Sequence, residues 1–180
     1  MSHVITVLAQ GFEETEAVTF IDLLRRAGVT ITVLGLDSRE VTGSHNITIT
    51  ADNLFSDFTG PFDGIVLPGG QPGTKNLGNS APLLDIIRAT YTRGRLCAAI
   101  CAAPTVLGKA GILSGHKATC FPGGEKDCSG ATMVETEVVR DRNVITSRGV
   151  GTAIPFALEL ISYLVNPEAA RKISKSIIYK

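Results

Sequence analysis

Short apolar runs alternate with helical patterns along the whole chain. Val4–Leu8 is rich in β-branched residues and ends in a polar loop, which is typical of a buried strand. Apolar side chains then recur at helical spacing from Ala17 to Ala27, and Gly28 is placed to end that helix. The same reasoning predicts strands at 29–34, 62–67, 95–100, 135–140 and 144–147, a half-exposed strand or hairpin arm within 41–51, and helices at 82–93, 103–110 and 153–164.

This alternation predicts an α/β fold in which a mostly parallel sheet is covered by helices on both faces. In such sheets, functional groups gather beyond the carboxyl ends of the strands. Three loops at predicted strand ends carry unusual chemistry, namely 11–16, 68–70 and 101–104, and we expect them to converge on one cleft. No internal repeat or linker interrupts the pattern, so we expect a single domain over residues 1–180.

Charge and composition narrow the function classes. Lys+Arg 17 balances Asp+Glu 17, so no basic excess is present to hold a nucleic acid or an anionic membrane. Gly, Pro or a charged residue interrupts every apolar run before it is long enough to cross a membrane. The first residues lack the pattern of a secretory signal. We therefore expect a soluble cytoplasmic protein that has neither nucleic acid nor membrane as a partner.

The four cysteines are expected to be reduced thiols in that compartment. They stand at positions 97, 101, 120 and 128. Cys97 and Cys101 are separated by three residues rather than two, and no His pair follows at zinc-finger spacing. The sequence thus predicts no metal site and no cofactor.

Cys101 is the strongest candidate for a functional residue. It follows a predicted buried strand and precedes a predicted helix, and its neighbours Ala102 and Ala103 are small enough for a sharp turn. A nearby helix N-terminus would favour the thiolate, so we expect Cys101 to be reactive at neutral pH. The alternative is that Cys101 is a small buried apolar side chain, as many free cysteines are.

Two further loops contain candidate partners for this thiol. Pro68–Gly70 is either a simple turn or a backbone that comes close to a ligand and offers N–H groups to a developing oxyanion. Glu13, Glu14 and Glu16 are either catalytic candidates or a solvated helix start, where carboxylates are stabilised by the helix dipole. Not all three can be catalytic.

Four stretches, GFEETEA, VLPGG, AAICAAP and TSRGVGTA, occur in the order and spacing of the ThiJ/PfpI superfamily. The chain resembles this superfamily over nearly its whole length, and most closely the branch of Parkinson disease protein 7 and the bacterial YajL-type proteins. The resemblance implies a flavodoxin-like three-layer sandwich with a nucleophile elbow between strand and helix. It also implies a homodimer.

The resemblance assigns roles to individual positions. The elbow cysteine of the family falls on Cys101, and the acidic residue that hydrogen-bonds its sulfur falls on Glu16, which is expected to be protonated beside a thiolate. Glu13 and Glu14 are then helix-start residues. Gly70, with its neighbour Gly69, and Ala102 match the groups that bind an oxyanion or substrate, and Arg148 matches an arginine near the site and the dimer contact, as does Arg26 less closely.

Two departures from other members of the superfamily argue against a Cys-His triad. Ala102 stands where protease-like relatives have a His, and Phe121 stands where some relatives have another. We therefore expect His3, His45 and His116 to be surface residues. Cys120 is interpreted as a packing residue, with a second thiol near the site as the alternative.

These residues favour a protective protein that acts on reactive carbonyls, either as a glutathione-independent glyoxalase or as a deglycase. In this reading its partner is a small reactive carbonyl or a glycated substrate. The alternative is a redox-sensing chaperone or regulatory protein that responds to oxidative stress through oxidation of Cys101. A cysteine peptidase or amidase is less favoured because the expected base is missing, and a nucleotide-binding role lacks a Gly-rich phosphate loop after the first strand.

Overall fold

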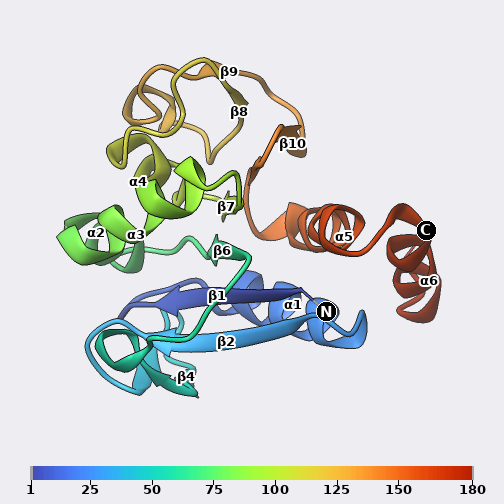
Figure 1. Ribbon diagram of the computed structural model, residues 1–180, viewed down its shortest axis with the longest axis horizontal. Helices are drawn as coiled ribbons and strands as arrows, with labels where there is room; N and C mark the ends of the chain where they lie inside the picture. Colours follow the sequence, from blue (N-terminus) through green and yellow to red (C-terminus); the bar gives the residue numbers. More distant parts are fainter. Residues whose placement is uncertain (1, 180) are drawn as a thin grey trace.

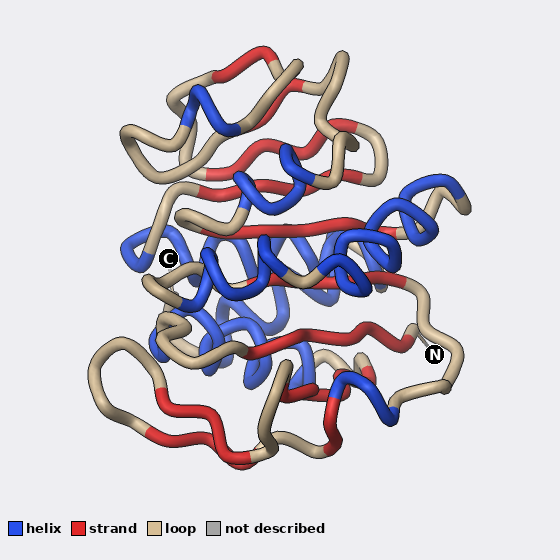
Figure 2. The backbone as a smooth tube through the Cα atoms, turned by 90° about the vertical axis from the view of Figure 1, so that its left-hand side faces the viewer, coloured by secondary structure: helices blue, strands red, loops and turns tan. Residues whose placement is uncertain are grey.

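The computed structural model describes residues 2–179, and its centre is a seven-stranded sheet (Figures 1 and 2). The strand order is β10-β11-β7-β6-β1-β2-β5, and every neighbouring pair is parallel except β10 and β11. The strands of this sheet are β1 (His3–Leu8), β2 (Thr30–Gly35), β5 (Asn53–Leu54), β6 (Gly64–Leu67), β7 (Leu96–Ile100), β10 (Val138–Asp141) and β11 (Val144–Ser147).

Alternate side chains of the inner strands supply two hydrophobic cores, one on each face of the sheet. On one face, Val4 and Leu8 of β1 pack with α1 (Glu14–Arg26), α5 (Ala153–Leu164) and α6 (Pro167–Ser176). On the other face, Ile5 and Val7 pack with α2 (Gly73–Asn79), α3 (Ala81–Thr92) and α4 (Pro104–Lys109). Figure 2 shows the resulting three layers, with helices in front of and behind the strands.

Smaller elements surround the sheet. A hairpin of β3 (Glu40–Thr42) and β4 (Thr48–Thr50) follows β2, and β8 (Lys117–Ala118) pairs with β9 (Thr132–Met133) beyond α4. Short 3-10 helices occur at η1 (Phe55–Asp57), η2 (Glu125–Asp127) and η3 (Val150–Thr152). None of the helices within residues 2–179 is long and apolar enough to cross a membrane.

The predicted α/β fold with a mostly parallel sheet and helices on both faces is confirmed. The predicted strand within 41–51 is a two-stranded hairpin, because the turn at 43–47 separates β3 from β4. The prediction omitted α2 and α6. In α2, three glycine or asparagine residues after Gly73 weaken the helical pattern. In α6, Ile173 is the one buried residue, so the sequence lacks the repeated apolar positions that mark a helix.

Candidate active site

The three loops predicted to converge do so at the carboxyl ends of β1, β6 and β7. Their residues Glu13, Glu16, Gly70 and Cys101 line one cleft of about 500 Å³. The loop after β11 closes the opposite wall with Arg148 and with 149–152, and Phe121 and Pro122 complete the lining. The chain thus brings together five segments that are widely separated in sequence, and four of them follow parallel strands that end at the same edge.

Cys101 occupies a strained elbow directly after β7. Its backbone has φ 65°, in the left-handed region, which costs on the order of 1–3 kcal/mol for a residue other than glycine. Its N–H donates to the Ser147 carbonyl (3.0 Å), and its own carbonyl accepts from the Phe121 N–H (2.7 Å). These two hydrogen bonds hold the elbow from both sides, while the thiol remains half-buried at the cleft.

Glu16 lies in the first turn of α1 and is fully buried beside this thiol. Its Oε2 accepts from the Gly69 N–H at 2.8 Å. Its Oε1 accepts no conventional hydrogen bond from residues 2–179, and the Cys101 thiol lies within hydrogen-bonding reach of the carboxyl. A Cβ on Gly69 would stand 2.6 Å from the Cβ of Cys101, so only glycine allows the two residues to approach in this way.

Burial dominates the acid-base properties of the pair. It raises the pKa of the Glu16 carboxyl to about 7, although the hydrogen bonds from Gly69 and Cys101 lower it in part. Burial, followed by the charge of Glu16 and the hydrogen bond to it, raises the pKa of Cys101 to about 12. The expected rise of the Glu16 carboxyl pKa by burial is confirmed in direction, whereas the pKa of the Cys101 thiol is also raised, so burial opposes the expected thiolate.

The backbone donors around the sulfur are those of Ala102 and Gly70. Both N–H groups hydrogen-bond to the Cys101 sulfur and lower its pKa by less than burial raises it. Gly70 has φ 88°, and a side chain there would collide with the backbone of Phe12 and Glu13. The Gly69 N–H, by contrast, donates to Glu16, so in this structure Gly69 holds the carboxyl, and its role at a substrate stays a prediction.

A model of the DJ-1/PfpI family matches residues 2–163 of this chain, which include the elbow and both partners of its thiol. The chain belongs to the DJ-1/PfpI family. It is 39% identical over 178 residues to protein dj-1beta of Drosophila melanogaster, covering 97% of this chain and 95% of that protein. The crystal structure of Drosophila DJ-1beta superposes with a TM-score of 0.96 over 100% of both chains.

Other relatives of this DJ-1/PfpI chain differ in length and name. It is 42% identical over 181 residues (98% of this chain) to protein DJ-1 homolog B of Arabidopsis thaliana, but it spans only 41% of that protein. A protein named deglycase from Pyrococcus abyssi is 31% identical over 166 residues, which are 90% of this chain and 99% of that protein. The structure of an oxidized Toxoplasma gondii DJ-1 is 37% identical, with a TM-score of 0.95 over 99% of both chains.

The two arginines singled out from the sequence lie in different places on this DJ-1/PfpI chain. Arg148 lines the cleft, and its Nη1 lies 3.8 Å from Oε2 of Glu135. Arg26 pairs with Asp22 at 2.7 Å near the other end of α1 and does not line the cleft. Arg148 is therefore the arginine that a single copy of the chain places near Cys101.

The histidines of this DJ-1/PfpI protein are only partly as expected. No histidine lines the cleft within the described residues, in agreement with the absence of a Cys-His triad. The prediction that His116 is a surface residue is wrong, because its ring is buried and hydrogen-bonds to the Tyr91 hydroxyl at 2.8 Å. His3 is partly buried and contacts the Thr32 hydroxyl. The His45 ring is exposed but is held by Glu13 and Glu14.

Several residues of the cleft were not predicted. The stretch 149–152 forms its far wall, and Phe121 presents an exposed ring to it. The glycine-rich stretch TSRGVGTA contains residues 149–152 and is the sequence feature that points to this wall, but a role is predicted from the sequence only for its Arg148. Cys120 is buried and contacts Cys128 through its sulfur, which supports the packing interpretation rather than a second thiol in the cleft.

Proposed function

We propose that this protein converts reactive 2-oxoaldehydes such as methylglyoxal into 2-hydroxy acids without glutathione, with Cys101 as the nucleophile and Glu16 as acid and base. The observation that supports this most strongly is the pairing of a half-buried elbow thiol with a carboxyl whose pKa is about 7. A general base is most effective when its pKa lies near the working pH. The same thiol chemistry applied to early glycation adducts would make the protein a deglycase, the name that the Pyrococcus abyssi relative carries.

The chemistry needs no redox cofactor. Ionised Glu16 takes the thiol proton as the Cys101 sulfur bonds to the aldehyde carbon, and the new alkoxide receives that proton to give a hemithioacetal. Glu16 then removes the proton on that carbon and returns it to the neighbouring carbon, which gives the thioester of the 2-hydroxy acid. Water cleaves the thioester, so that methylglyoxal and water become lactate and the thiol is restored.

The N–H groups of Gly70 and Ala102 and the side chain of Arg148 support the anionic steps. Because the two N–H groups point at the sulfur, they stabilise the charge that appears there when the proton leaves. Arg148 lies in the same cleft and supplies a positive charge for the carboxylate product. A cysteine peptidase is not supported, since the part of the cleft that the structure describes lacks a His base.

Lactate formation from methylglyoxal in the absence of glutathione is the direct test. The wild-type protein should produce lactate in proportion to its concentration, measured enzymatically or by chromatography. Cys97→Ser is the matched control, because Cys97 is a fully buried cysteine directed at the Ile87 carbonyl and should be dispensable for turnover. A wild-type protein that consumes methylglyoxal only by forming stable adducts, without lactate, would contradict the proposal.

A second candidate function is a redox response through Cys101, and one observation favours it. The same N–H groups that point at the sulfur would donate to the oxygens of a sulfinate, and a protonated Glu16 would donate to it as well. Two equivalents of hydrogen peroxide oxidise the thiol to the sulfinic acid and release two waters. A solved relative is an oxidized DJ-1 of Toxoplasma gondii.

Mass spectrometry after mild hydrogen peroxide treatment tests this candidate. We expect the peptide that contains Cys101 to gain two oxygen atoms before the peptides of Cys97, Cys120 and Cys128, since those three cysteines are buried and Cys101 is not. The sensor hypothesis fails if Cys101 stays unmodified while any of the buried cysteines gains oxygen.

A further inference from the structure

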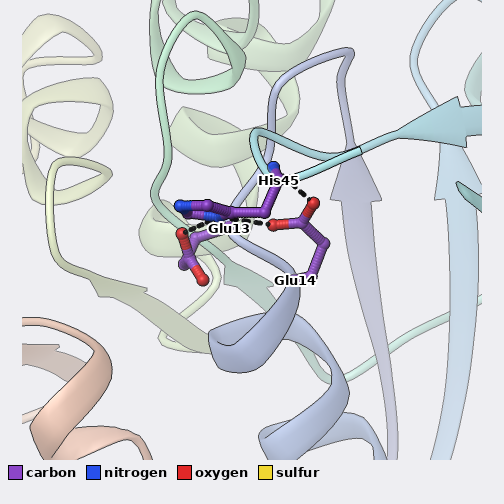
Figure 3. Close-up of side chains that lie close together, drawn as sticks. All are labelled: Glu13, Glu14 and His45. Carbon is purple, nitrogen blue, oxygen red and sulfur yellow. Dashed lines mark hydrogen bonds and ion pairs between the residues drawn. The ribbon is translucent and has the colours of Figure 1, made fainter. Parts of the chain in front are cut away.

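A second group of ligand-type side chains lies at the start of α1, next to the cleft of Cys101, which Glu13 also lines. Glu13 and Glu14 point from the N-terminus of the helix toward His45, which projects from the turn between β3 and β4 (Figure 3). His45 Nδ1 is 3.1 Å from Glu14 Oε2 and 3.3 Å from Glu13 Oε2. Within residues 2–179 this is the only set of three His, Cys, Asp or Glu side chains whose ligand atoms come together in this way.

The hydroxyl of Ser44 completes a four-atom arrangement around one point. Its Oγ is 3.2 Å from Glu13 Oε2, 3.4 Å from Glu14 Oε2 and 3.1 Å from His45 Nδ1. A tetrahedral zinc ion with bonds of about 2.0–2.1 Å requires its ligand atoms to be about 3.3 Å apart. Five of the six edges of this tetrahedron therefore already have the length that zinc coordination demands.

The remaining contacts of the two carboxylates orient them as ligands. Glu14 Oε1 accepts the backbone N–H groups of His45 (2.7 Å) and Ile47 (3.3 Å), and Glu13 Oε1 accepts that of Thr15 (3.3 Å). Each carboxylate thus has one oxygen fixed by the backbone while the other faces the cluster, as outer hydrogen bonds do around metal ligands. A Cβ on Gly43 would collide with the Glu14 carboxyl, so the turn leaves room for it only because residue 43 is glycine.

The charges of the cluster also favour a dication. Glu13 and Glu14 are 8% and 4% exposed, and His45 is the only cationic partner among their ion pairs in the described part of the chain. Two buried carboxylates therefore face one imidazole, which offsets at most one of the two negative charges.

We propose that Glu13, Glu14 and His45 bind a zinc ion, with the fourth position taken by the Ser44 hydroxyl or by a water molecule. The His45 side chain is 70% exposed, so the ion reaches the cluster from solvent. The bound ion clamps the turn at 43–47 to the start of α1. This site uses none of the four cysteines and does not depend on the function proposed for Cys101.

Zinc binding is best measured on Cys101→Ser as well as on the wild type, because a thiol beside a carboxyl also attracts zinc. Competition with a chromophoric zinc chelator should give one zinc per chain in both proteins. His45→Gln should weaken the affinity at least about tenfold in either background, since even loss of an outer partner of a metal site has such an effect. Because the ring is exposed, this variant should fold as the wild type does, and circular dichroism checks this.

Two further measurements make the result decisive. His3→Gln is the matched control, because His3 is another partly exposed histidine and is directed at Thr32 rather than at a carboxylate, so its zinc affinity should equal that of the wild type. Cobalt in place of zinc should show the visible bands of a tetrahedral site without a thiolate-to-cobalt band. Failure of Cys101→Ser to bind zinc, unchanged affinity in His45→Gln, or a thiolate band in the cobalt spectrum would each overturn the proposal.

Discussion

Replacing Cys101 by Ser is expected to lower kcat/KM for lactate formation from methylglyoxal by about 10³-fold or more, as is typical when a covalent nucleophile is lost. Serine keeps the size and the elbow backbone, but its hydroxyl is far less acidic than a thiol. Glu16, with a pKa of about 7, can accept a proton from a thiol whose pKa is about 12 during attack, but a hydroxyl is much harder to deprotonate. Steady-state kinetics on freshly reduced protein would measure the loss.

Folding controls separate this effect from damage to the elbow. Cys101 has φ 65°, and serine should adopt this backbone at a similar cost, so the thermal midpoint should change little. Cys97→Ser, made and assayed in parallel, should retain turnover. Lactate production by Cys101→Ser at a rate near that of the wild type would refute the assignment of the nucleophile.

Glu16→Gln is expected to move two readouts in opposite directions. Turnover should fall by about 10²–10⁴-fold, because the amide cannot accept the protons that the reaction transfers. Alkylation of Cys101 by iodoacetamide, in contrast, should have a lower pH midpoint than in the wild type, because the charge of Glu16 raises the pKa of the thiol. A residue with a purely structural role would not produce faster alkylation together with slower turnover, so parallel loss of both would contradict the proposed role.

The stability of the same variant should depend on pH in a defined direction. The carboxyl pKa is raised from 4.5 to about 7 on folding, so the folded protein holds a proton that the unfolded chain has lost. The free energy of unfolding of the wild type therefore falls as pH rises between these values, by about 3 kcal/mol in total. Glu16→Gln lacks this titration. Denaturant unfolding at pH 4.5 and pH 7.5 should show the variant gaining stability relative to the wild type at the higher pH.

The sequence was informative where local pattern determines structure. The buried strand 95–100 followed by Cys101 and two alanines predicted the elbow, and the observed strand Leu96–Ile100 ends where expected. The selection of Glu16 from three nearby glutamates came from the family resemblance, because nothing in the spacing of EETE says which carboxyl turns inward. In the folded chain Glu16 faces Cys101, whereas Glu13 and Glu14 face His45.

The properties that the sequence could not supply depend on contacts between distant segments. The pKa of Cys101 was expected to be low because of the following helix, but burial and Glu16 raise it, and both depend on how α1 packs against the elbow. His116 is buried and hydrogen-bonds to Tyr91 of α3, a contact between segments 25 positions apart. The cluster of Glu13, Glu14 and His45 joins residues that are 31 or 32 positions apart, and no spacing rule connects them.

Gly69 carries a consequence for attempts to transplant this site. Its N–H donates to the Glu16 carboxylate, and its carbonyl accepts the N–H of Glu13, so this single residue ties the end of β6 to the start of α1. Copying only the elbow loop into another protein would reproduce the backbone of Cys101 but would not position Glu16 beside its thiol. A transplanted site therefore needs the loops at the ends of β1, β6 and β7 together. Substitutions in the walls of the cleft should be tolerated better than substitutions where Gly69 meets the start of α1.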